Sequence, residues 1–369
     1  MNSKLLVLIA GIIIVAGVFV FFASDMMGDE ANQAMQVESD NEDIPEAKIM
    51  ITDGTKHTVP LDKILSGGPP PDGIPSIDSP KFVTSSEADF VSDSDIVLGL
   101  NINGDTRAYP LFILVWHEIV NDRVGGIPVA VTYCPLCYTS QVFERYVMGQ
   151  EVEFGTSGKL YNSNLVMYDR LTGTYWSQAL GTAIKGELAG QHLEILPFDV
   201  ISWSDWKELY PDTIVLSTDT GHLRSYGTDP YGNYYTDSRI IFPVENDDDR
   251  MHPKEIILGF EHEGIYKAYK QADVESVGVI NDEVGGNPIL LASSYDGNTR
   301  AFERTVDGQV LHFEDVQGQL VDSAGSVWNY EGQATSGSFE GYKLDRLASS
   351  PGFWFEWVAF HPDTEVYIP

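Results

Sequence analysis

The sequence predicts a mainly β protein, of the α+β type with few short helices, in which two tandem related β-rich units follow an N-terminal transmembrane helix. Three observations predict it: one long apolar run near the N-terminus, short β-branched runs divided by glycine-rich turn signals, and segments that recur at a constant spacing. With 369 residues, of which 43% are hydrophobic, the chain can bury the core of one large or two medium domains.

Residues 1–27 are expected to form a membrane anchor. Residues 5–23 are an unbroken apolar run of about nineteen residues, enough to cross roughly 30 Å of hydrocarbon as a helix. Cleaved signal peptides end in small residues, whereas bulky residues fill 19–22 here, so the anchor is expected to stay uncleaved. Lys4 precedes the run and Asp25 follows it, which predicts a single-pass cell-membrane protein with an extracytoplasmic body.

Residues 28–80 are expected to form an acidic tether and a Pro/Gly-rich lead-in. Residues 38–46 are highly charged and almost free of apolar side chains, so burial cannot offset the entropy of ordering them. Residues 66–75 read Ser-Gly-Gly-Pro-Pro-Pro-Asp-Gly-Ile-Pro, where the prolines fix φ and the glycines permit turns. This second stretch is predicted to be irregular rather than helical or extended.

The charge of the chain bears on its partners. The chain has 22 Lys and Arg against 55 Asp and Glu, a formal net charge of −33. A surface that binds nucleic acid must supply clustered Lys and Arg to release counterions, so no nucleic-acid partner is expected. The charge instead indicates a strongly solvated surface, and the membrane, reached through the N-terminal helix, is the partner that the sequence predicts.

Segments in the two halves of the body match one another at a constant spacing, which is typical of an internal duplication. Residues 96–99 match 256–259, and residues 120–128 match 280–288. After short deletions Trp176 aligns with Trp328, as do later tryptophans of the two halves. The sequence therefore predicts a first β-rich repeat at 81–245 and a second, degenerate one at 246–369.

Within each repeat the elements are predicted to be strands and hairpins. Short apolar and β-branched runs such as 129–133 follow turn signals such as Gly125-Gly126. One short helix is expected over 202–210, because Ser202 can cap its N-terminus and Pro211 ends it. Trp176 belongs to the shared pattern, so it is expected in the core.

Reactive residues that occur in one repeat only are candidates for function. The chain's two cysteines, Cys134 and Cys137, follow the strand predicted at 129–133, and the second repeat has Ser-Ser-Tyr-Asp-Gly at 293–297. His117 is replaced by Val277 in the second repeat. The cysteines and His117 are thus predicted to belong to a site that only the first repeat carries.

The residues alone allow three interpretations of the cysteine pair. Two thiolates three residues apart, with His117 completing the site, suit a soft metal, copper being favoured over zinc outside the cytoplasm. A Cys-Pro-x-Cys pair after a strand also suits reversible thiol–disulfide chemistry. The third reading is a non-enzymatic surface binding module in which the pair closes a structural disulfide. Whether the protein is an enzyme is left open.

A polar run after the cysteines is predicted to shape the mouth of the site. Tyr161, Asn162 and Ser163, followed by Tyr168 and Asp169, supply donors and acceptors for a polar ligand. A hydrogen-bonded turn before a hairpin is the alternative reading. The part of the second repeat that corresponds to this run is shorter.

Several of these motifs together resemble domain-of-unknown-function family 3179 (DUF3179). They are Trp-His-Glu-Ile-Val-Asn-Asp at 116–122, Thr-Tyr-Cys-Pro-Leu-Cys at 132–137, Leu-Tyr-Asn-Ser-Asn at 160–164, Met-Tyr-Asp-Arg at 167–170 and the lead-in at 67–75. The resemblance implies a prokaryotic protein, often exported or membrane-anchored, without an established activity. The residues that carry it include His117, both cysteines and the five polar residues of the mouth.

Overall fold

The computed structural model describes residues 48–294 and 298–369. The predicted anchor at 1–27 and the tether as far as residue 47 lie outside these residues. Within the described ranges, no helix combines the length and apolar character needed to cross a bilayer. The described part is mainly β with few short helices, which confirms that part of the predicted fold class.

A first series of elements occupies 96–216. Its strands are β5 (Ile96–Ile102), β6 (Asp105–Pro110), β7 (Ile119–Val124), β8 (Ile127–Cys134), β9 (Thr139–Glu144), β10 (Tyr146–Val147), β11 (Gln150–Glu151), β12 (Phe154–Tyr161), β13 (Asn164–Asp169), β14 (Tyr175–Ser177), β15 (Ala183–Lys185), β16 (Asp199–Ser202) and β17 (Ile214–Leu216), and its helices are α2 (Leu111–Leu114) and α3 (Trp203–Leu209). Ser202 caps α3 by accepting a hydrogen bond from the Asp205 amide, which confirms the predicted helix start.

A second series occupies 256–366. Its strands are β18 (Ile256–His262), β19 (Ile265–Lys270), β20 (Val279–Val284), β21 (Asn287–Ser293), β22 (Thr299–Glu303), β23 (Thr305–Val306), β24 (Gln309–Val310), β25 (Phe313–Val316), β26 (Gln319–Asp322), β27 (Val327–Trp328), β28 (Ala334–Ser336), β29 (Arg346–Leu347), β30 (Ser350–Phe353) and β31 (Glu365–Val366), and its helices are α4 (Gln271–Val277) and α5 (Trp354–Phe360).

The two series pair their strands in the same way. The order β16-β5-β6-β17 in the first corresponds to β30-β18-β19-β31 in the second, and β7-β8-β9 corresponds to β20-β21-β22. Likewise β12 to β15 correspond to β25 to β28. In both series the last strand runs parallel to its neighbour, β17 to β6 and β31 to β19, while the other pairings are antiparallel. Each series is thus built from the same set of hairpins.

Side-chain contacts repeat along with the strands. Trp206 donates its indole N–H to Thr213 at 2.9 Å, and Trp357 donates to Thr364 at 2.8 Å. In both helices this tryptophan packs on a strand glycine, Gly99 in the first series, where a Cβ would overlap the ring. The shared tryptophans are therefore scaffold residues, and the buried Trp176 confirms the prediction that it lies in the core.

The N-terminal part adds elements that only the first series has. They are β1 (Met50–Thr52), β2 (Thr55–His57), β3 (Leu65–Ser66), β4 (Phe82–Thr84) and the 3-10 turns η1 (Leu61–Lys63) and η2 (Ser85–Glu87). Strands β1 to β3 extend the sheet of β12 to β15 to seven strands, and β4 pairs with β17. The segment 67–81 between β3 and β4 forms no helix, and its single β-bridge, Ile77 to Val120, leaves the lead-in irregular as predicted.

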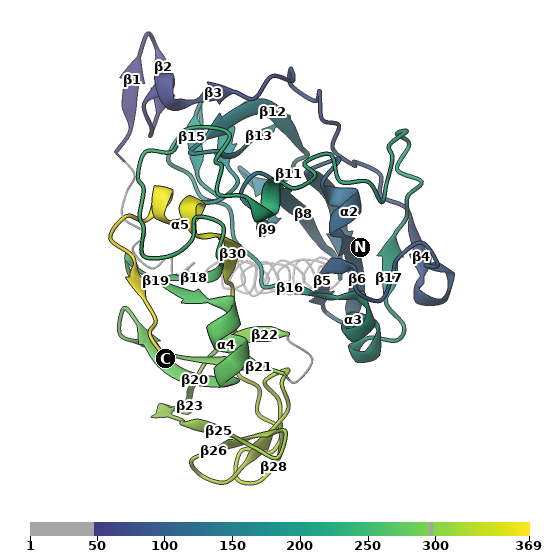
Figure 1. The fold of residues 1–369 in the computed structure, drawn as a ribbon, viewed down its shortest axis with the longest axis vertical. Coiled ribbons are helices and arrows are strands. Elements are labelled where there is room, and N and C mark those ends of the chain that lie inside the picture. The colour runs from purple at the N-terminus through teal and green to yellow at the C-terminus, as the bar shows by residue number, and fades with distance from the viewer. Residues whose placement is uncertain (1–47, 295–297) are drawn as a thin grey trace, which may run out of the picture. The chain divides into compact units, whose positions relative to one another are not determined.

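The two series meet through reciprocal contacts. Gln141 on β9 donates to Ser350 on β30 at 2.7 Å, and Arg300 on β22 binds Asp199 on β16 at 2.9 and 3.0 Å. Because β22 corresponds to β9 and β30 to β16, these are the same pair of positions used in both directions. Figure 1 shows β30 of the second series lying beside β9 of the first. Phe353 and Phe355 thereby join the apolar cluster that also contains both cysteines.

Candidate functional site

Cys134 is the last residue of β8, and Cys137 lies in the four-residue turn that connects β8 to β9, called the cysteine turn below. Cys134 pairs with Thr139 across the hairpin, and the Cys137 amide donates to the Cys134 carbonyl at 3.3 Å, which closes the turn. Both cysteines are free and buried, at 1% and 0% exposure. The second series holds the turn from its own side, since the Phe353 amide donates to the Cys137 carbonyl at 2.8 Å.

Buried polar groups surround the sulfur of Cys137. The Asn164 amide nitrogen lies 3.2 Å from Cys137 Sγ, 2.8 Å from Gln178 Oε1 and 3.3 Å from Glu356 Oε1. Burial raises the pKa of the Cys137 thiol and that of Glu356 well above their usual values. Burial therefore disfavours the charged forms of Cys137 and Glu356. Glu356 reaches this cluster from α5 of the second series.

Both ring nitrogens of His117 are engaged in hydrogen bonds. Its Nδ1 donates to the Pro75 carbonyl at 2.8 Å, and its Nε2 is 2.6 Å from the Tyr226 hydroxyl, which must then donate. Burial lowers the His117 pKa to about 4. In the part of the chain that the structure describes, no three His, Cys, Asp or Glu side chains group as a metal site, so the structure does not bring His117 and the cysteine pair into one ligand set.

Tyr161, Asn162 and Ser163 lie where β12 turns into β13. Tyr161 donates to Glu245 at 2.8 Å, and Asn162 binds the Ala359 carbonyl and the Glu245 amide at 3.1 and 3.0 Å. The buried Ser163 hydroxyl has no hydrogen-bond partner among the described residues. The first two residues thus hold the segment before β18 and the end of α5 against the first series.

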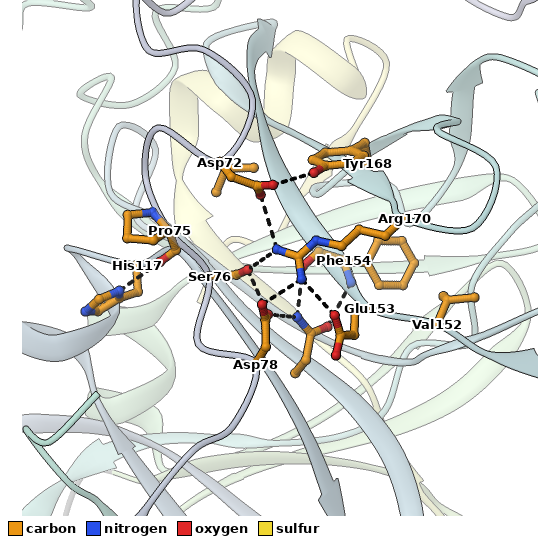
Figure 2. A network of polar contacts seen from close by, with 12 residues as sticks. Asp72, Pro75, Ser76, Asp78, His117, Val152, Glu153, Phe154, Tyr168 and Arg170 are labelled. Carbon is orange, nitrogen blue, oxygen red and sulfur yellow. Dashed lines mark hydrogen bonds and ion pairs between the residues drawn. The ribbon is translucent and has the colours of Figure 1, made fainter. Parts of the chain in front are cut away.

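Tyr168 and its neighbour Arg170 hold the lead-in (Figure 2). Tyr168 donates to Asp72 at 2.5 Å, and the Arg170 guanidinium binds Asp78 at 2.6 Å, Glu153 at 2.8 Å and Ser76 at 2.9 Å. The second series has Ser323 in the place of Arg170. Both residues of the motif therefore bind the chain itself in this structure.

Asp169 points to the opposite side of β13 and belongs to the scaffold. It accepts from the Trp176 indole at 2.9 Å and from the Thr172 amide at 2.6 Å. Asp322 accepts from the Trp328 indole at 2.8 Å in the second series. The same contact on both sides indicates a structural role for Asp169.

A pocket of about 230 Å³ lies beside the cysteine turn. The lead-in, the cysteine turn, β12 and β13 and the connection after β17 form its walls. The lining residues used below are Ile74, Glu118, Leu136, Leu165, Tyr231 and Phe242. Leu136 stands between the two cysteines in sequence. The pKa of Tyr231, another lining residue, is raised chiefly by burial and further by the proximity of Glu118, Cys134 and Cys137. The pocket and the dithiol turn are thus neighbours.

Glu118 is a residue of this site that the sequence reading passed over. It follows His117, lines the pocket and is 7% exposed, and burial raises its pKa to about 8. Burial is the cause of this shift, and no hydrogen bond from the described residues contributes to it. The signal was available, because the corresponding residue of the second repeat is Gly278.

Comparisons with known proteins give a family but no activity. A family model described as protein of unknown function (DUF3179) matches residues 71–364, most of the chain. No curated protein and no solved structure matches the chain.

Proposed function

We propose a function for a chain that belongs to the DUF3179 family, whose function is unknown: it binds a soft monovalent copper ion through the thiolates of Cys134 and Cys137. The observation that carries the proposal is the buried pair of free thiols on one closed turn. Soft thiolate ligands select Cu(I), which accepts two ligands, whereas a structural zinc ion takes four. With two sulfurs and no third ligand grouped with them in the described chain, the site favours copper.

The surroundings of Cys137 favour a metal over a reactive thiol. Nucleophilic thiols have a lowered pKa next to a positive charge. Here the described groups that shift the Cys137 pKa are Cys134, Thr139 and Asn164, none of them positive, and burial raises that pKa. A metal cation brings its own positive charge and displaces the thiol protons as it binds. The Asn164 N–H then serves as a hydrogen-bond donor to a ligating sulfur.

Copper loading of the full-length chain in detergent tests the proposal. The protein is reduced, given a Cu(I) acetonitrile complex without oxygen, and titrated with a coloured Cu(I) chelator. We expect about one copper per chain in the wild type and none in the Cys134→Ser, Cys137→Ser double variant. Met148→Leu, which removes an exposed soft ligand elsewhere, serves as the matched control. Equal copper in the wild type and the double variant would refute the site.

A His117→Gln variant separates the two-thiolate site from the three-ligand site. We expect the copper affinity to stay within about threefold of the wild type, because both His117 nitrogens are engaged with Pro75 and Tyr226. A loss of tenfold or more would place His117 among the ligands and replace the two-coordinate proposal.

Thiol–disulfide exchange is the second candidate, favoured by the placement of both sulfurs on one turn. In that reaction a partner disulfide is reduced to two thiols, Cys134 and Cys137 form one S–S bond, and their two protons pass to the partner sulfurs. Alkylation mass spectrometry after exposure to glutathione disulfide distinguishes it. A reversible loss of both alkylated thiols in copper-free protein supports exchange, and persistent free thiols oppose it.

The location and the repeat organisation complete the proposal. The apolar run at 5–23 supports a single-pass anchor with an extracytoplasmic body. The two strand series have the same strand order and the same pairing, which supports an origin by duplication with units near 81–245 and 246–369. Protease treatment of intact cells tests the orientation, since an extracytoplasmic body is cut without lysis.

A further inference from the structure

Glu118 is placed in the pocket by a backbone conformation that an ordinary side chain disfavours. Its φ is 60°, in the left-handed region, whereas the corresponding Gly278 has a φ of 81°. The hydrogen bonds around the two residues agree: each amide donates to a helix carbonyl, Leu114 or Val274, at 2.7 or 2.8 Å. The backbone conformation at this position therefore favours glycine, and the first series carries a glutamate there despite the strain.

Glu118 is 7% exposed, and no hydrogen bond from the described residues contributes to the pKa of its carboxyl group, which burial raises. Buried polar groups in folded proteins are nearly always hydrogen-bonded, so a buried acid of this kind that lines a pocket points to a ligand. The pocket is otherwise mainly apolar near this group, with Ile74, Leu136, Leu165 and Phe242 among its lining residues. Strain, burial and the place in the pocket converge on the same side chain.

We propose that this pocket binds a small, uncharged, largely apolar molecule, and that the Glu118 carboxyl group hydrogen-bonds to a carbonyl oxygen of that molecule. The proposal is independent of copper binding. It assigns a ligand site to the face of the cysteine turn that carries Leu136.

The size and polarity of the pocket support this class of ligand. A cavity of about 150 Å³ holds benzene, so one of about 230 Å³ holds a six-membered ring with a carbonyl group. The burial that raises the Glu118 pKa to about 8 keeps the acid protonated and able to donate. Lys159 also lines the pocket, and its positive charge disfavours a cationic ligand.

Three probes of one shape test the class of ligand on the full-length protein. Cyclohexanone, methylcyclohexane and cyclohexylammonium are compared by ligand-observed NMR. We expect cyclohexanone to bind at least about threefold more tightly than either of the others, because only its oxygen accepts the Glu118 hydrogen bond. Tighter binding of the ammonium probe, or equal binding of all three, would overturn the proposed class.

Two substitutions test the residue. Glu118→Gln keeps a neutral donor of similar size, so cyclohexanone binding should stay within about threefold of the wild type. Glu118→Gly installs the residue of the corresponding position, so the Tm should rise while cyclohexanone binding falls about tenfold. Leu165→Phe, which fills the pocket, should abolish binding of the ketone in all backgrounds. Unchanged ketone binding in Glu118→Gly, or a lower Tm, would overturn the proposal.

Discussion

The ion pair that joins the two series is expected to be a main determinant of stability. Asp199 is 2% exposed and binds two guanidinium groups, Arg300 at 2.9 Å and Arg346 at 2.5 Å. Burial by itself raises the pKa of Asp199, but the charges of Arg346 and Arg300 outweigh burial and hold the pKa at about 2. In Asp199→Asn the buried Arg300, at 4% exposure, loses its counter-charge.

The magnitude follows from two independent estimates. Removing one partner of a buried ion pair costs about 3–5 kcal/mol, because the other charge stays buried and unpaired. A pKa lowered from 3.8 to about 2 corresponds to about 2.5 kcal/mol of stability at neutral pH. We therefore expect Asp199→Asn to lose about 3 kcal/mol of unfolding free energy at pH 7.

The pH dependence gives the sign of the effect. Because the pKa of Asp199 is lower in the folded state, its contribution is fully present above pH about 4 and is lost as the pH falls towards 2. The difference in stability between the wild type and Asp199→Asn should therefore shrink over this range. Urea denaturation followed by tryptophan fluorescence measures the free energy at each pH.

The other series supplies a matched control. At the reciprocal contact, Gln141 and Ser350 form a neutral hydrogen bond. The double variant Asp199→Ser, Arg300→Gln copies that pair and should recover at least half of the unfolding free energy lost in Asp199→Asn. Asp93 forms an exposed ion pair with Lys207, so Asp93→Asn should change the unfolding free energy by less than about 0.5 kcal/mol. A loss below 1 kcal/mol in Asp199→Asn, or no pH dependence, would refute the reasoning.

Three further outcomes are expected. Gly99→Ala should cost about 2–3 kcal/mol by overlap with the Trp206 ring, measured by urea denaturation; an unchanged midpoint would contradict the packing. Arg170→Met should release the lead-in and speed its cleavage by thermolysin within 67–78. An unchanged cleavage rate would show that the Tyr168 hydrogen bond to Asp72 suffices to hold this segment. Asn164→Leu should lower Cu(I) affinity about tenfold in the chelator titration, while an unchanged affinity would remove Asn164 from the copper site.

The fold class could be predicted because its signals are local. Strand runs, glycine turns and the cap of α3 depend on residues a few positions apart, and Ser202 caps the helix where the sequence places it. The lead-in shows where local rules end. Its prolines and glycines predict an irregular path, but the contacts that fix this path come from Tyr168 and Arg170, far along the chain.

The site could be predicted in part only. The cysteine turn is local, so the sequence locates it. Glu356, by contrast, reaches Asn164 from α5, which lies 192 positions further along the chain, about the length of a domain. His117 shows a second limit of sequence comparison. Its absence from the second repeat suggested a ligand shared with the cysteines, but the structure engages it with Pro75 and Tyr226. The absence of a residue from one repeat makes it a candidate for function, but it does not show which groups that residue contacts.

Comparison of corresponding positions becomes more informative when backbone conformation is added. Ser163, with a φ of 63°, corresponds to Gly318, with a φ of 82°, just as Glu118 corresponds to Gly278. At both positions a polar side chain replaces the glycine that the turn favours. Both residues are buried, and the Ser163 hydroxyl has no hydrogen-bond partner among the described residues. Strain at two such positions is explained by selection for what the side chains do rather than for stability.

The second series then has a role beyond repetition. It lacks the cysteines and the glutamate of the pocket, yet the Phe353 amide donates to the Cys137 carbonyl and Glu356 contacts Asn164 beside the Cys137 sulfur. Because β30 and α5 also carry the reciprocal contact at Ser350, the position of these two residues depends on the packing of one series on the other. Substitutions at that interface should therefore alter copper affinity as well as stability, although they lie outside the first repeat.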